Sequence, residues 1–188
     1  MHYRYLGKST PYRGFFRMEK HKVEHERFDG SSVVIERELM ERGDAVALLL
    51  YDPAHDEVLL LEQFRIGPAA RGDHPWLIEI VAGMVDAGES IEACAVREAI
   101  EEAGYAPHNL RHLGRYYTTP GGCSERIDLF YGECERDHPL SSGGGVAHEH
   151  EDIRRFWVKR EVALEWVRQG RIASGAPMLA LLLAFGGK

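Results

Sequence analysis

The segment from Ser90 to Gly104 constrains the fold more than any other part of the chain, because its residue types define both ends of a helix. Serine commonly caps the first helical turn, and glycine commonly follows the last turn, where the backbone needs a left-handed conformation. With successive residues about 100° apart around the axis, one face of this helix is apolar. That face consists of Ala93, Val96, Ile100 and Ala103. The opposite face carries Glu98, Glu101 and Glu102.

This group of glutamates has two interpretations. Like charges at such spacings cost an isolated helix roughly 0.2–0.5 kcal/mol per pair, and Arg97, one turn before Glu101, offsets part of this cost. The simpler interpretation is therefore a solvated acidic face. The alternative is a partial Mg²⁺ site, because Glu98 and Glu102 lie one turn apart. Mg²⁺ commonly binds through one or two carboxylates, water and substrate phosphate oxygens.

Residues 1–42 are predicted to form a small antiparallel N-terminal β sheet. The stretch "FFRMEKHKVEHERF" alternates polar and apolar residues, "DGSS" is typical of a turn, and "VVIERELM" resumes the alternation.

Residues 43–188 are predicted to form one larger domain of α/β or α+β type, in which a mixed sheet is flanked by helices. Strands are predicted at "AVALLLYD", "EVLLLEQFR", "WLIEIVAG", "RIDLFYGEC" and "IRRFWV". Further helices are predicted at "REVALEWVRQG" and near residues 177–185. The segments "IGPAARGDHP" and "SSGGGVAHEHED" are expected to be loops.

Composition excludes several classes of protein. A formal net charge of -7 argues against a broad basic face for nucleic acid. Three cysteines without CxxC spacing indicate neither a disulfide framework nor a zinc site, so we expect a cytoplasmic protein. The N-terminal "MHYRYLGKSTPYRGFF" lacks the apolar run of a signal peptide, and "MLALLLAF" is far shorter than the roughly 20 residues of a membrane helix. No membrane association is expected.

The stretch "GMVDAGESIEACAVREAIEEAGY", residues 83–105, resembles the Nudix box. The positions in register with that motif are Gly83, Glu89, Arg97, Glu98, Glu101, Glu102 and Gly104. The chain is therefore similar to the Nudix hydrolases. This resemblance implies an α/β/α sandwich, and hydrolysis of a diphosphate linked to a nucleoside, with a divalent metal held by the box glutamates.

Flanking segments extend the resemblance to the bacterial ADP-ribose pyrophosphatases. They are "YRGFF", "RELMERGDAVALLLYDP", "EVLLLEQFRIG", "PWLIEIVAGMVDAGES", "TPGGCSER" and "HEHEDIR". This resemblance implies Mg²⁺-dependent hydrolysis of ADP-ribose to AMP and ribose 5-phosphate, by a homodimer with exchanged N-terminal sheets. Two alternatives stay open: a sister Nudix diphosphatase acting on another nucleoside diphosphate sugar, NADH or a dinucleoside polyphosphate, and a sensor that binds ADP-ribose without cleaving it.

The same resemblance implies a metal site. Its ligands would be the backbone carbonyl of Ala82 and the side chains of Glu98, Glu102 and Glu151. Mg²⁺ is the implied metal and Mn²⁺ an alternative. Glu149 is the implied general base, and the two loop glutamates could exchange roles. From the residues alone, this loop is either an exposed polar segment or, because His148 and His150 alternate with the glutamates, a transition-metal site.

The substrate contacts implied by the resemblance are Phe15, Phe16, Arg37, Arg65, Met84, Gly121 and Glu125. Arg65 would bind the diphosphate, because a guanidinium forks well onto phosphate oxygens. Glu125 would accept hydrogen bonds from hydroxyls of the terminal ribose. Phe15, Phe16 and Arg37 would enclose the adenine, partly from the other subunit. Without the resemblance, Arg65 is a surface arginine at a strand end, and paired phenylalanines are more often core residues.

Overall fold

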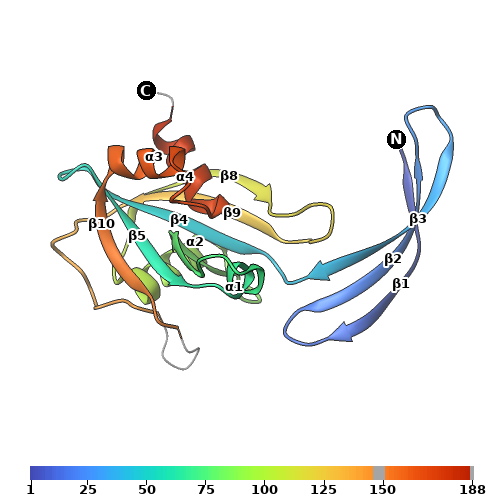
Figure 1. The fold of residues 1–188 in the computed structure, drawn as a ribbon, viewed down its shortest axis with the longest axis horizontal. Helices are drawn as coiled ribbons and strands as arrows, with labels where there is room; N and C mark the ends of the chain where they lie inside the picture. Colours follow the sequence, from blue (N-terminus) through green and yellow to red (C-terminus); the bar gives the residue numbers. More distant parts are fainter. Residues whose placement is uncertain (146–150, 187–188) are drawn as a thin grey trace. The chain divides into compact units, whose positions relative to one another are not determined.

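The structure is a computed structural model of the 188-residue chain, and it describes residues 1–145 and 151–186. Its contacts divide the chain into two compact units (Figure 1). Unit 1 comprises Met1–Asp44 and Tyr117–Arg126, and unit 2 comprises Ala45–Tyr116 and Ile127–Lys188. The N-terminal region predicted over residues 1–42 falls within unit 1. Unit 1 also includes the loop of residues 117–126, which the sequence did not assign to it.

Unit 1 is an antiparallel sheet of β1 (Tyr3–Arg13), β2 (Arg17–Glu26) and β3 (Ser32–Glu41), in that order. The predicted hairpin is confirmed as β2 and β3. Strand β1 was not predicted, because its pairing with β2 shifts register twice, between Tyr5 and Gly7 and between Ser9 and Tyr12. Such bulges break the alternation by which a strand is recognised.

Unit 2 contains a seven-stranded sheet. Its strands are β4 (Ala45–Asp52), β5 (Glu57–Phe64), β6 (Trp76–Glu79), β7 (Val81–Met84), β8 (His108–Tyr117), β9 (Arg126–Glu133) and β10 (Arg154–Lys159). The main order is β10-β5-β4-β9-β8, and β4 runs parallel to β9. Strand β8 was not predicted. The predicted strand "WLIEIVAG" is divided at Ile80 into β6 and β7.

Strands β4 and β5 separate beyond their hairpin, and this separation leaves room for two short strands that lead to the candidate site. Their register runs from Leu50 to Asp52 on β4. Beyond it, β7 pairs with β4 through Val81–Met84, whereas β6 pairs with β5 through Trp76–Glu79. The two short strands therefore fill the space between the separated strands, and β7 then leads into the next helix.

The helical segments of unit 2 are α1 (Ile66–Arg71), α2 (Ile91–Glu98), the π-helical η1 (Ala99–Ala103), α3 (Arg160–Arg168) and α4 (Gly175–Phe185). The prediction of a loop across "IGPAARGDHP" was wrong, since this segment contains α1. Pro68 lies in the first turn, where its missing N–H breaks no helical hydrogen bond. Within residues 1–145 and 151–186, no helix is long and apolar enough to cross a membrane.

The core of unit 2 lies on both faces of the sheet. From β4, Val46, Leu48 and Leu50 pack in one cluster with residues of α2, whereas Ala47 and Leu49 pack in a second cluster with residues of α3 and α4. Figure 1 shows α2 on one side of this sheet and α3 and α4 on the other. Strand alternation thus gives a mixed sheet between two helical layers, which confirms the predicted sandwich.

Candidate functional site

The helix that carries the glutamates begins and ends as predicted. The Oγ of Ser90 accepts a hydrogen bond from the N–H of Ala93 at 3.1 Å. Gly104 ends the helix at φ 78°, and a Cβ there would lie 2.4 Å from the carbonyl oxygen of Ser141. Its last turn is π-helical over Ala99–Ala103, so the helix is wider there than an α-helix.

The predicted division of this helix into an apolar face and an acidic face was partly wrong. Ala103 is buried, but Ala93 is exposed, and the core positions are Cys94, Ala95, Ala99 and Ala103. Glu102 is also buried, with only 2% of its surface exposed. Glu102 can be buried because its carboxyl group accepts a hydrogen bond from the N–H of Ala82 on β7, at 3.0 Å. A buried acceptor with such a partner can lie on a core face.

Arg97 links the acidic side chains of the helix. Its guanidinium contacts Glu89 (2.9 Å from Nε to Oε1), Glu98 (2.7 Å) and Glu101 (3.1 Å). It also donates to the carbonyl oxygen of Met84 at 3.2 Å. The bond to Arg97 lowers the pKa of Glu89 to about 2. The predicted contact between Arg97 and Glu101 is therefore present, as one part of a larger network.

Gly83 lies against Glu98 so closely that no other residue type fits without displacing the glutamate. A Cβ on Gly83 would lie 1.9 Å from Oε1 and 2.0 Å from Cδ of Glu98. Strand β7 thus packs directly against the Glu98 side chain. The glycine is needed here for close approach and not for an unusual backbone angle.

The pKa values of Glu98 and Glu102 are both raised, mainly by burial. Burial, together with the charges of Glu98 and Glu151, raises the pKa of Glu102 to about 8, although the hydrogen bond from Ala82 and the charge of Arg65 oppose the shift. Burial also raises the pKa of Glu98, with Arg97 opposing and Glu101 and Glu151 adding to the shift. Because burial disfavours the charged forms of both side chains, a cation bound beside them would stabilise their carboxylates.

Arg65 lies at the end of β5, where its backbone N–H donates to the carbonyl oxygen of Pro75 at 2.8 Å. Its guanidinium contacts the carboxylate of Glu79, on β6, at 2.7 Å from Nη2 to Oε2. Its positive charge opposes the rise in the pKa of Glu102, so it acts electrostatically on that side chain. The plain surface-arginine interpretation is therefore incomplete.

Met84, another predicted substrate residue, lies at the end of β7 in unit 2, and the remaining ones belong to unit 1. Phe15 is 83% exposed, and its ring meets that of Phe16 edge-on at 4.9 Å, so this pair is not a core pair. Arg37 lies on β3 and is exposed. Gly121 lies in the loop of residues 117–126, and the buried Glu125 forms an ion pair with Arg42 at 3.0 Å. His148, Glu149 and His150 lie outside the described residues.

Comparison with known proteins identifies the family. The model of the NUDIX domain matches residues 41–180, which is most of the chain. This chain belongs to the NUDIX family. The match includes all the box residues around Arg97 and extends from β3 to α4.

Several curated proteins that are similar to this NUDIX protein are named as pyrophosphatases. ADP-ribose pyrophosphatase of Escherichia coli (strain K12) is 44% identical over 94% of this chain and 84% of its own length. ADP-ribose pyrophosphatase of Haemophilus influenzae is 44% identical over 94% of this chain and 82% of its own length. GDP-mannose pyrophosphatase of Shigella flexneri is 37% identical over 82% of this chain and 80% of its own length.

A solved structure supports the NUDIX fold. The crystal structure of an ADP compounds hydrolase superposes with a TM-score of 0.76, covering 98% of this chain and 92% of that chain. At 21% sequence identity, this similarity concerns the fold alone.

In this NUDIX protein, the side chains of the implied metal ligands do not form a complete coordination site. Within the described ranges 1–145 and 151–186, no group of three or more His, Cys, Asp or Glu side chains is arranged to hold a metal ion. Glu98 and Glu102 both lie against β7 and supply oxygen donors, and Mg²⁺ commonly takes one or two protein carboxylates together with waters and substrate phosphates.

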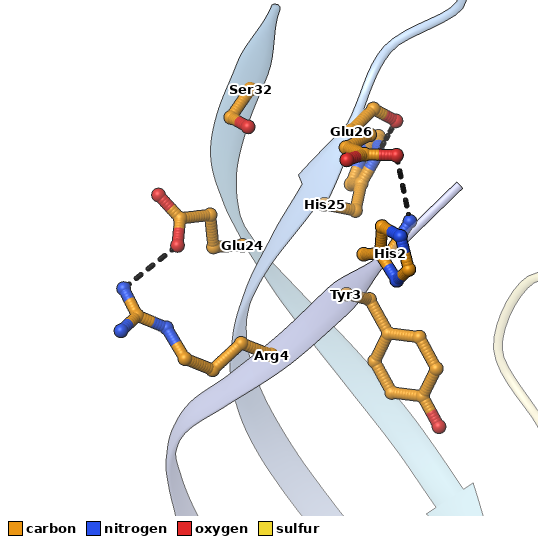
Figure 2. A pocket seen from close by; sticks show the side chains of 7 residues that line it. All are labelled: His2, Tyr3, Arg4, Glu24, His25, Glu26 and Ser32. Atoms are coloured by element: carbon orange, nitrogen blue, oxygen red, sulfur yellow. Dashed lines mark hydrogen bonds and ion pairs between the residues drawn. The ribbon is translucent and has the colours of Figure 1, made fainter.

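A surface pocket lies elsewhere, at one end of the unit 1 sheet (Figure 2). Seven residues line it: His2, Tyr3, Arg4, Glu24, His25, Glu26 and Ser32. Among the lining residues, Arg4 and Glu24 form an ion pair at 2.8 Å. The lining contains none of the predicted site residues.

Sequence reasoning missed Glu79. The available signal was a glutamate inside the otherwise apolar "WLIEIVAG", because a carboxylate in a buried strand requires a partner.

Proposed function

We propose that this chain hydrolyses the diphosphate bond of ADP-ribose to AMP and ribose 5-phosphate, with Mg²⁺ as cofactor. The observation that carries the proposal is the group of box carboxylates beside β7, where Glu98 lies against Gly83 and Glu102 accepts a hydrogen bond from the N–H of Ala82 at 3.0 Å. Such a group is suited to a divalent cation. ADP-ribose is favoured because relatives with that name are more similar over more of the chain than the GDP-mannose pyrophosphatase.

The donor set fits the metal. Mg²⁺ and Mn²⁺ are bound by carboxylate and carbonyl oxygens, and the Ala82 carbonyl would add to the three glutamates. When bound, the cation would neutralise diphosphate charge, polarise phosphorus and lower the pKa of a coordinated water.

The protein side chains would supply orientation and proton transfer. Arg65 would bind a diphosphate oxygen, and Glu149 would accept a proton from the attacking water. Arg97 would keep Glu98 oriented, since its guanidinium lies 2.7 Å from that carboxylate.

Unit 1 would supply the recognition of the nucleoside. Phe15, Phe16 and Arg37 would enclose the adenine, Met84 of unit 2 and Gly121 would contact the substrate, and Glu125 would accept from the terminal ribose. The high exposure of Phe15 supports a role in binding over a role in packing.

A homodimer with exchanged N-terminal sheets and a cytoplasmic location complete the proposal. The dimer has support in the exposed Tyr3 and Tyr5 of β1 and the exposed Phe28 of the turn between β2 and β3, because several large exposed apolar side chains on one small unit indicate an interaction surface. Light scattering after size exclusion would show twice the mass of the chain, and a monomer would contradict the dimer.

The substrate is tested with a panel of ADP-ribose, GDP-mannose, NADH and a dinucleoside polyphosphate. Each is incubated with enzyme and Mg²⁺, and phosphate is released from the products by a phosphatase. We expect the highest kcat/KM with ADP-ribose, and AMP with ribose 5-phosphate as products. A higher kcat/KM with GDP-mannose would support the second candidate, and binding without products would support a sensor.

The roles of Glu149 and Glu151 are separated by Glu149→Gln and Glu151→Gln. Loss of a metal ligand is relieved in part by raising the Mg²⁺ concentration, whereas loss of the base is not. We expect relief for Glu151→Gln alone. The opposite result would exchange the two roles.

A further inference from the structure

Glu79 is a buried carboxylate that the proposed mechanism does not yet use. It belongs to β6 and is 9% exposed. Its Oε2 accepts a hydrogen bond from Nε of Arg65 at 2.9 Å and lies 2.7 Å from Nη2 of the same guanidinium. The side chain of Gln63 donates to the same oxygen at 3.3 Å. One buried oxygen is therefore the centre of a small polar network around Arg65.

The sheet places this network on the same face as the box helix. Glu79 is the register partner of Leu61 on β5. Leu61 packs with Val81 and residues of α2 in one cluster, and directly opposed residues share a face of the sheet. Glu79 therefore directs the Arg65 guanidinium to the face where Glu98 and Glu102 lie. The lowering of the Glu102 pKa by the charge of Arg65 agrees with this placement.

The contact leaves much of the guanidinium available. Arginine carries five N–H donors, and Glu79 engages Nε–H and one N–H of Nη2. Within residues 1–145 and 151–186, the contacts of the Arg65 guanidinium use neither hydrogen of Nη1 nor the second hydrogen of Nη2, so these three can donate to a ligand. The Arg65 side chain is 43% exposed, so these donors are accessible to a ligand.

We propose that Glu79 is a positioning residue that holds Arg65 in the orientation that binds the substrate diphosphate, with Gln63 orienting Glu79 in turn. The proposal rests on the diphosphate role of Arg65 given above. A long side chain loses rotamer entropy when it binds a ligand, and prior fixation by a buried carboxylate lowers this loss. Without Glu79, the same arginine would be present but mobile.

The test uses Glu79→Gln, Arg65→Ala and the double variant, with kcat and KM for ADP-ribose measured at saturating Mg²⁺. Glu79→Gln keeps the size of the side chain and removes its charge. We expect KM to rise about tenfold while kcat changes little, because orientation of a binding group is lost. In the Arg65→Ala background, the same substitution is expected to have no further effect on KM.

A matched control is Glu62→Gln. Glu62 is a neighbouring glutamate on β5 with its own arginine partner, Arg154, at 2.6 Å. Its kinetics are expected to equal those of the wild type. A KM unchanged in Glu79→Gln, or an equal rise of KM in the presence and absence of Arg65, would overturn the positioning role. An unchanged KM in Arg65→Ala would instead refute the proposed role of Arg65 itself.

A second variant covers the case in which Glu79→Gln fails to fold. Gln63→Met removes only the 3.3 Å bond that orients Glu79. It is expected to raise KM about threefold with the melting temperature near that of the wild type. An unchanged KM in a folded Gln63→Met protein would also contradict the proposal.

Discussion

Replacing Gly83 with alanine should separate the activity of this protein from its stability. The new Cβ would lie 1.9 Å from Oε1 of Glu98, and such contacts require at least 3.0 Å. The carboxylate must therefore move by about 1 Å, the difference between those distances. A displacement of about 1 Å in a catalytic group can cost on the order of 10²-fold in rate, and we expect kcat/KM to fall by that factor, about 2.7 kcal/mol.

The folding cost should be much smaller, because the obstructing atoms belong to the end of a flexible side chain. The displaced Glu98 loses a partly exposed contact with Arg97, worth up to about 1 kcal/mol. Alanine restricts the unfolded chain more than glycine does, which returns about 0.4–1 kcal/mol. The net change in the free energy of unfolding should therefore lie within about 1 kcal/mol of zero.

The assay combines ADP-ribose turnover across a Mg²⁺ titration with urea unfolding. Gly175→Ala is the control, because a Cβ at Gly175 meets nothing within 4 Å. It should change neither activity nor stability appreciably. Wild-type turnover in Gly83→Ala would refute the role of Glu98 as a ligand, and an unfolded Gly83→Ala protein would refute the argument about side-chain flexibility.

Three further predictions follow from burial and backbone angles. Glu102→Gln should abolish turnover. It should also flatten the pH dependence of the metal-free melting temperature. The folded state of the wild type keeps a proton on Glu102 up to about pH 8, whereas the unfolded state loses it near 4.5, so stability should fall as pH rises across that window. A wild-type curve that stays flat between pH 5 and 8 would contradict this pKa. Gly104→Ala should destabilise the protein more than Gly170→Ala in urea unfolding. Both glycines have positive φ, at 78° and 72°, but only at Gly104 would the Cβ collide with backbone; equal losses would show that the collision is relieved. Cys94 and Cys134 should resist thiol reagents at pH 8 until the protein unfolds, because burial raises the pKa of each thiol to about 12; rapid labelling of either in the native protein would contradict this.

The parts of the fold that depend on local residue types could be predicted. Ser90 and Gly104 determine helix ends through interactions within a few residues, so the limits of the helix were correct. The buried strands of unit 2 are long apolar runs, and the predicted β4 and β5 are both present.

The parts that depend on distant contacts could not be predicted. Glu102 lies in the core because the N–H of Ala82 lies beside it, and nothing local to the helix reveals that partner. Periodicity therefore gave the wrong core face for Ala93. In the same way, the bulges of β1 and the pairing of β6 and β7 with the separated β4 and β5 depend on tertiary register.

The residues of the candidate site also differ in whether local sequence or a distant contact reveals them. The box residues were found because they stand at fixed spacings in one segment. Glu79 was not found, because its connection to Arg65 joins positions fourteen residues apart on paired strands.

The π-helical turn at Ala99–Ala103 makes the direction of Glu102 sensitive to chain length. Because this turn is wider than an α-helical turn, deleting one residue between Glu98 and Glu102 would change the direction of the Glu102 side chain and remove it from the N–H of Ala82 on β7. A one-residue deletion there would abolish turnover by misorienting Glu102, although every glutamate of the site would still be present.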